Sequence, residues 1–90
     1  MFLVFGKIRI NKPYKEWEHL FLAHRDARLE AGIEDVLHAP VIGRQEVMYV
    51  VRTAHPRLVH DLMYTQEARA HIEASGHVPG TEEYTVCEEI

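Results

Sequence analysis

The sequence predicts an α+β protein of the ferredoxin-like type, with elements in the order β-α-β-β-α-β and two helices on one face of an antiparallel sheet. Two observations carry this prediction. Runs of β-branched and aromatic residues with a period of two alternate with amphipathic stretches of helical period. Glycine or proline stands near most of the boundaries between them. A chain of 90 residues accommodates one domain, residues 1–90, with a thin core.

The amino-terminal half predicts a strand, a helix and a second strand. Phe2–Ile10 has the β-branched and aromatic composition of a first strand. A helix is expected over Tyr14–Ala31, ended by Gly32. Val36–Ile42 is the expected second strand, and Pro40 within it favours a sheet edge or a bulge.

The carboxy-terminal half repeats the pattern. Gly43–Glu46 predicts a hairpin turn, and Val47–Thr53 has the strong β composition of a third strand. The second helix is expected from about Arg57 to Ser75, with a break possible at Thr65, because a threonine can cap a fresh turn. Thr81–Ile90 is the expected last strand.

The third strand is apolar on both sides. Val47, Tyr49 and Val51 fall on one side, and Met48 and Val50 fall on the other. Such a strand is typical of a sheet that is covered on both faces. Because the two helices cover only one face of this short chain, we expect a second copy to cover the other in a homodimer.

Charge and cysteine content restrict the partners and the compartment. The net charge is −4 and the basic residues are scattered, which argues against a nucleic-acid partner. Cys87 is the only cysteine, which favours a reducing cytoplasm in the absence of a secretory signal. The apolar start is interrupted by Lys7 and Arg9, so it is too short for a signal segment or a membrane span. We therefore expect a cytoplasmic protein with no membrane partner.

Two polar residues lie on the apolar face of the first helix. At helical spacing, His24 and Arg28 fall among Trp17, Leu20, Phe21 and Ala31, and such groups are costly to bury unpaired. Three interpretations stay open. The helix rolls so that Arg28 reaches solvent and His24 makes one hydrogen bond in the core; or Arg28 pairs with a carboxylate, which can belong to the partner subunit; or both line a pocket, with Arg28 binding an anionic oxygen and His24 acting as acid or base.

The third interpretation makes His24 and Arg28 the candidate catalytic residues. The candidate ligand-binding residues are Trp17, Phe21, His38, Tyr49 and His77. Aromatic side chains more often pack in a core, but Trp17 and Tyr49 suit a pocket wall best. His38 faces either the pocket or the subunit interface, and whether it meets His24 and His77 stays open.

Metal and cofactor sites are not expected. The seven histidines lack metal-ligand spacing, and no glycine-rich phosphate loop occurs. His60 and His71 fall on the polar face of the second helix, where a solvated position is the simpler interpretation. Cys87 has no adjacent base that would make it a nucleophile.

Short motifs add a resemblance to a known superfamily. The element order, the Tyr14-Lys15-Glu16-Trp17 opening of the first helix and the Ile72-Glu73-Ala74-Ser75-Gly76-His77 segment resemble the dimeric α+β barrel proteins. That group includes antibiotic-biosynthesis monooxygenases and muconolactone isomerases. The chain is most similar to a bacterial family of unknown function, of about this length, with an "EEW" opening and an "SGH" ending. The resemblance implies a dimer with a pocket between helices and sheet, but it transmits no reaction.

Two functions remain. The first is a homodimer that binds a small organic molecule, neutral or anionic, between the first helix and the sheet. The resemblance implies that an enzyme of this kind would be a cofactor-free oxygenase or isomerase. The alternative is a non-catalytic regulatory or assembly protein that acts through its dimer surface. A cavity beside His24 and Arg28 favours the first function, and full burial with a carboxylate partner favours a structural role.

Overall fold

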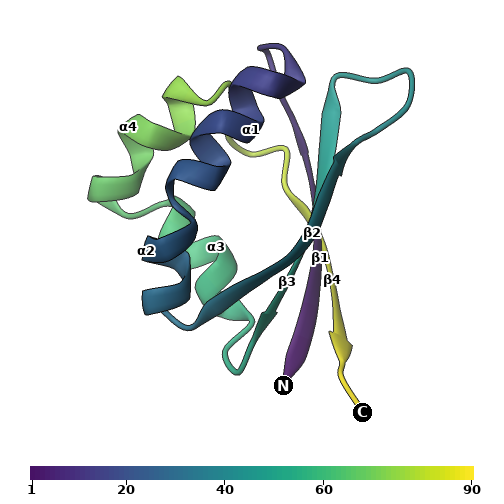
Figure 1. Ribbon diagram of the computed structural model, residues 1–90, viewed down its shortest axis with the longest axis vertical. Coiled ribbons are helices and arrows are strands. Elements are labelled where there is room, and N and C mark those ends of the chain that lie inside the picture. Colours follow the sequence, from purple (N-terminus) through teal and green to yellow (C-terminus); the bar gives the residue numbers. More distant parts are fainter.

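The computed structural model describes residues 1–90 and confirms the ferredoxin-like α+β fold. One antiparallel sheet forms a layer, and all helices cover the same face of it (Figure 1). The strand order is β2-β3-β1-β4, so β2 and β4 are the edges. The elements are β1 (Phe2–Arg9), α1 (Tyr14–Ala23), α2 (Arg25–Glu30), β2 (Ile33–Pro40), β3 (Glu46–Thr53), α3 (Arg57–Met63), α4 (Gln66–Ala74) and β4 (Glu83–Glu88).

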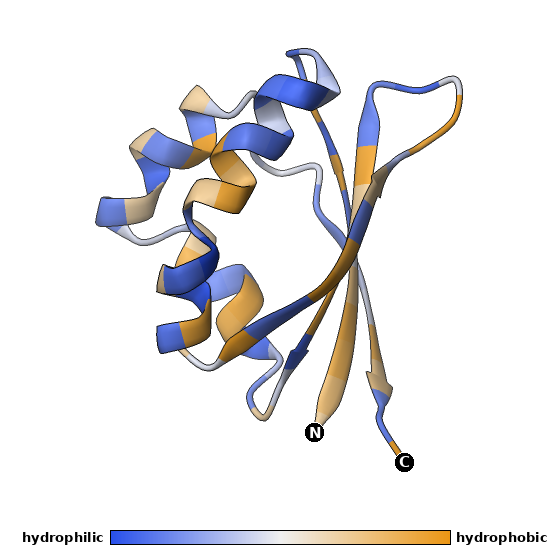
Figure 2. Cartoon of the chain, viewed as in Figure 1, coloured by the Kyte–Doolittle hydropathy of each residue, from blue (hydrophilic) through white to orange (hydrophobic).

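The core lies between the sheet and the helices. Val4 of β1 pairs with Val51 of β3 and with Val86 of β4, and β1 and β3 are the two inner strands of the sheet. Val4, Val47 and Val51 are fully buried. The helices turn their apolar sides toward the sheet and their polar sides outward (Figure 2). No helix is long and apolar enough to cross a membrane.

The first helix is not continuous, contrary to the expected span Tyr14–Ala31. It breaks at His24 into α1 and α2. In an unbroken helix the His24 amide would donate to the Leu20 carbonyl. Here the imidazole Nδ1 lies 2.8 Å from that carbonyl, while the amide donates to Phe21 O. The side chain thus replaces a backbone hydrogen bond, which ends the regular helix.

The second helix also divides, at the expected residue. Thr65 accepts a hydrogen bond from the Ala68 amide and caps α4, while its hydroxyl donates to the Leu62 carbonyl at the end of α3. This satisfies orphan backbone groups of both helices. The break lets α3 and α4 follow the sheet at different angles (Figure 1).

The second strand begins earlier than expected. The segment Ile33–Asp35, expected to be a connection, already pairs with β3. Gly32 has a φ of 94°, a conformation that turns the chain directly from α2 into the sheet. The strand then has a bulge between Asp35 and Leu37 and ends at Pro40, on the sheet edge that proline favours.

Candidate functional site

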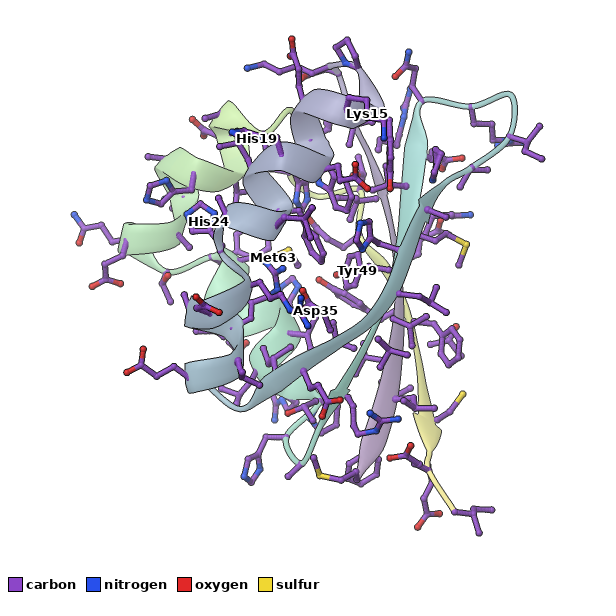
Figure 3. All side chains as sticks on the ribbon, viewed as in Figure 1. Lys15, His19, His24, Asp35, Tyr49 and Met63 are labelled. Atoms are coloured by element: carbon purple, nitrogen blue, oxygen red, sulfur yellow. The ribbon has the colours of Figure 1, made fainter.

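A cavity of about 410 Å³ lies between the helices and the sheet. All four helices contribute to its walls, together with residues of β1, β2 and β3, and most of the lining is apolar. Asp35 and Tyr49 extend from the sheet toward the helices beside this space, where Met63 also lies (Figure 3). The polar residues of the lining are His24, Arg28, Thr65, Glu67, His71, Ser75 and His77. A mainly apolar cavity with a few polar groups is typical of a site for a small organic molecule.

Aromatic side chains form one wall of the cavity. Trp17 is 3% exposed and stacks on Phe21 with ring centroids 4.6 Å apart. The Phe21 ring lies in turn 6.1 Å from that of Tyr49. These three of the five candidate ligand-binding residues therefore line one continuous surface.

Arg28 is held in an ion pair within the same subunit. Its Nε donates to Asp35 Oδ1 at 2.8 Å, and its Nη2 donates to Asp35 Oδ2 at 2.6 Å. Nη2 also donates to the Phe21 carbonyl at 2.7 Å, and the guanidinium lies 3.7 Å from the Phe21 ring centroid. Two side chains in this bidentate arrangement fix the plane of the guanidinium.

The pairing leaves one edge of Arg28 free. Nη1 makes no hydrogen bond within the chain, and it is not among the buried atoms that lack a partner. Arg28 thus combines two of the open interpretations, since it pairs with a carboxylate and also lines the cavity. Sequence reasoning missed Asp35 because the segment that carries it was expected to be a connection rather than strand β2.

His24 lies at the cavity with its Nδ1 engaged. Because a carbonyl can only accept, Nδ1 is the protonated nitrogen opposite Leu20 O, and Nε2 carries a lone pair. The ring centroids of His24 and of His71 on α4 are 4.5 Å apart. His71 is exposed, as expected, but it also lines the cavity, which helix periodicity alone could not show.

His38 lies outside the cavity lining. Its Nε2 is 3.0 Å from Glu18, whose carboxylate also accepts a hydrogen bond from Tyr14. The His38 and Tyr14 hydrogen bonds hold the pKa of Glu18 below its usual range. His24, His38 and His77 therefore do not converge. His24 and His77 line the cavity, whereas His38 on β2 contacts Glu18 on α1.

His77 belongs to a second buried pair. Its Nε2 lies 2.6 Å from Glu82 Oε1, and both side chains are at most 5% exposed. The same oxygen accepts a hydrogen bond from Tyr64 at 2.7 Å and one from the Gly80 amide at 3.2 Å. Burial by itself raises the pKa of Glu82, but the hydrogen bonds from Tyr64 and His77 outweigh it, so the pKa lies below its usual range.

The Tyr49 ring lies over Gly6 of the neighbouring strand. Tyr49 pairs with Gly6, and a Cβ at Gly6 would stand 2.6 Å from the Tyr49 hydroxyl oxygen, so no larger residue fits there without movement. The hydroxyl is buried and makes no hydrogen bond. Burial raises the pKa of Tyr49 to about 12.

Fold and cavity together define a ferredoxin-like α+β protein with an internal site, and solved structures share this architecture. A protein of Deinococcus radiodurans, provisionally described as an antibiotic biosynthesis monooxygenase, is 14% identical with a TM-score of 0.58, over 100% of this chain and 93% of its own. One of Caulobacter crescentus CB15, described in the same way, is 18% identical with a TM-score of 0.63, over 99% and 89%. A third antibiotic biosynthesis monooxygenase is 10% identical with a TM-score of 0.64, over 100% and 99%.

At these identities the likeness concerns the fold, and it confirms the fold that the resemblance in sequence implied. No protein-family model and no curated protein matches the chain. The similarity to one bacterial family of about this length therefore stays a prediction.

Proposed function

We propose that the protein binds a small, mainly apolar organic molecule with one anionic or acidic oxygen in the cavity between helices and sheet. The observation that carries this proposal is a cavity with an aromatic wall whose lining includes Arg28, a guanidinium whose Nη1 has no hydrogen bond within the chain. Trp17 and Phe21, both in the lining, give the cavity an apolar aromatic wall. A guanidinium edge beside such a surface suits a carboxylate or a phenolate on an aromatic skeleton.

The ion pair with Asp35 supports this role. It fixes the guanidinium in position before a ligand arrives, so little side-chain entropy is lost on binding. It also balances the charge of Arg28 while the cavity is empty, which lowers the cost of holding a cation beside apolar walls. Arg28 then acts as an oriented hydrogen-bond donor rather than as a bare charge.

If the protein is an enzyme, proton removal from the bound molecule is the chemistry that its residues support. His24 has a free Nε2 lone pair at the cavity, as a general base requires. A carbanion formed in this way is the common starting point of cofactor-free oxygenation and of isomerisation. The solved structures with this fold carry monooxygenase descriptions, and we propose this class of reaction for the present chain.

The test uses the single tryptophan as a reporter. Trp17 lies in the cavity wall, so a ligand that enters the cavity should change its fluorescence. We expect 2-naphthoate to bind more tightly than the neutral isostere 2-naphthamide. In the double variant Arg28→Met/Asp35→Leu this preference should fall by about 1.5–3 kcal/mol, the scale of a charge-assisted hydrogen bond.

The matched control is Arg25→Met, which removes an exposed arginine of the same helix, α2. It should keep the preference for 2-naphthoate. A chain whose Trp17 fluorescence responds to neither compound would contradict the proposed function and favour the regulatory or assembly alternative.

We further propose that the protein is a homodimer that forms through the outer face of the sheet. On this face Val50 of β3 lies between Phe5 of β1 and Leu37 of β2. Leu37 and Met48 are 55% and 39% exposed, although only ten hydrophobic residues of the chain are buried. Val50 itself is 6% exposed, so Leu37 and Met48 provide the exposed apolar surface, and surface of this kind marks interaction sites.

Sedimentation tests the dimer. Wild-type protein at micromolar concentration should sediment at about twice the chain mass of 10.5 kDa. Met48→Glu should shift it toward a monomer, whereas Ile42→Glu, at an exposed site in the β2–β3 loop, should not. A wild-type monomer would contradict the proposed dimer without affecting the proposal about the cavity.

A further inference from the structure

We propose that His77 is a proton acceptor of the cavity and that Glu82 is the residue that positions it. The inference rests on the proposed function and deepens it, because it assigns a second proton acceptor besides His24 for an acidic oxygen or carbon on the bound molecule. It starts from a feature that helix and strand patterns do not reveal, the buried contact between His77 and Glu82.

The contact fixes the tautomer of His77. Glu82 is a carboxylate and accepts hydrogen bonds from Tyr64 and from the Gly80 amide at the same Oε1. The imidazole must therefore donate from Nε2 at 2.6 Å. In a neutral imidazole with the proton on Nε2, Nδ1 carries the lone pair.

That lone pair is accessible. His77 Nδ1 makes no hydrogen bond within the chain. The buried side-chain polar atoms that lack a partner are Glu46 Oε1 and Tyr49 Oη, so His77 Nδ1 is not one of them and must reach open space. His77 is only 4% exposed and lines both the cavity and a smaller hollow beside Tyr64 and Pro79, and we place the accessible nitrogen on the cavity side.

Glu82 also stabilises the protonated ring. When Nδ1 takes a proton, the imidazolium keeps its Nε2 hydrogen bond to a carboxylate at contact distance in a dry environment. His24 lacks this support, since a neutral backbone carbonyl orients it. The other titratable or charged groups that line the cavity or the smaller hollow with His77 come from every surrounding element: His24 between α1 and α2, Arg28 on α2, Tyr49 on β3, Tyr64 after α3, and Glu67, Arg69, His71 and Glu73 on α4.

The step is balanced as a proton transfer. An O–H or C–H bond of the ligand breaks, its proton moves to Nδ1, and the electron pair stays on the ligand. The products are a ligand anion and an imidazolium whose charge faces Glu82. Arg28 lines the same cavity, and its Nη1, which has no hydrogen bond within the chain, can donate one to the anionic oxygen.

Nitrogen-15 NMR of the imidazoles tests the first half of the inference without any ligand. At neutral pH, His77 should show the tautomer with the proton on Nε2 and an unprotonated Nδ1. Tyr64→Phe removes another hydrogen bond to the same Glu82 oxygen and should leave this tautomer in place. A His77 with its proton on Nδ1 would overturn the inference, whatever binds in the cavity.

The second half is tested with 4-nitrophenol, whose phenolate absorbs visible light. Trp17 fluorescence reports binding, and absorbance reports ionisation of the bound probe over a pH series. We expect the bound probe to ionise about tenfold more readily in wild-type protein than in Glu82→Gln, which keeps a hydrogen-bond acceptor but removes the charge. His77→Gln should show the same loss, and the exposed control His19→Gln should not.

The outcomes separate the two proposals. If the probe binds and ionises equally in wild type, Glu82→Gln and His77→Gln, the inference fails and the proposed function stands. If neither 4-nitrophenol nor 2-naphthoate changes Trp17 fluorescence, the proposed function fails, and the role of His77 fails with it. Unfolding curves of each variant show whether a loss reflects the site or the fold.

Discussion

Two hydrogen-bonded side-chain pairs border the same cavity, and they differ in burial and in chemistry. Arg28 and Asp35 join α2 to the edge strand β2, with side chains 18% and 11% exposed. His77 and Glu82 lie in the segment between α4 and β4, with side chains 3% and 5% exposed. The first pair carries a permanent cation, while the second contains an imidazole, which has two nitrogens that can hold a proton.

The difference shows how a small fold can provide two functions at one cavity. A guanidinium tolerates partial exposure, because its charge is permanent and its fork geometry keeps it in place. A histidine that exchanges protons with a ligand gains from deeper burial, where the carboxylate acts at full strength. Substitutions in the two pairs can therefore distinguish the fixed charge of Arg28 from the proton of His77, and their expected effects on stability differ in size.

Breaking the first pair should have the largest effect on folding. Arg28→Met keeps the length of the side chain but leaves the Asp35 carboxylate without its partner. We expect the free energy of unfolding to fall by about 3–5 kcal/mol. Urea unfolding measures it, with Arg25→Met as the control, and a loss no larger than that of the control would show that the pair is not structural.

Breaking the second pair should cost less and should depend on pH. Glu82→Gln removes the acceptor of charge-assisted hydrogen bonds and should lower the free energy of unfolding by about 2 kcal/mol at neutral pH. Because the pKa of Glu82 is depressed in the folded state, its contribution is present above the unfolded-state pKa and is lost as the pH falls through the folded value. The gap between wild type and variant should therefore close on acidification, as urea unfolding at several pH values will show.

Tyr49 in the cavity wall offers a third test. Its ring packs directly over Gly6 of the neighbouring strand β1. Gly6→Ala places a methyl group against this buried ring, so we expect a loss of about 1–3 kcal/mol in the free energy of unfolding. A variant as stable as wild type would mean that the Tyr49 ring can move aside.

Replacing the first pair as a whole should have a smaller effect than breaking it. Arg28→Met/Asp35→Leu removes both charges and keeps apolar volume, so its stability should return to within about 1 kcal/mol of wild type. Thermal unfolding of the double and single variants measures the recovery. A double variant as unstable as Arg28→Met would place the effect in the packing of Arg28 on Phe21 rather than in the stranded carboxylate.

The smallest effect is expected for Tyr49→Phe. The hydroxyl has no hydrogen-bond partner, so its removal should be nearly neutral at pH 7. With a pKa raised to about 12, Tyr49 favours folding fully below its unfolded value near 10, and this contribution is lost as the pH rises through the folded value. Because burial raises the pKa of Tyr14 to about 12 as well, the late phenolate absorbance of wild type should be reduced in the variant rather than abolished.

The sequence predicts the elements better than the contacts between them. Periodicity and turn residues gave the β-α-β-β-α-β order and the cap at Thr65, because local backbone preferences determine both. The break at His24 escaped prediction because it depends on one side chain that competes for a carbonyl.

In the site, too, the positions of residues along a helix were predictable and their contacts with other elements were not. Helix spacing placed Trp17, Phe21, His24 and Arg28 on one face, and all four line the cavity. The carboxylate partners Asp35 and Glu82 were not predicted, because each meets its partner through a turn whose geometry no periodic pattern encodes.

The most direct test of the central claim is to locate a bound probe by isotope-edited NMR. With 2-naphthoate present, we expect nuclear Overhauser effects from the probe to methyl groups of Leu20, Leu62 and Ile72, which line the cavity from three helices. Contacts confined to Leu37 and Met48 on the outer face of the sheet would contradict the account, since the ligand would then occupy the surface that we assign to the dimer.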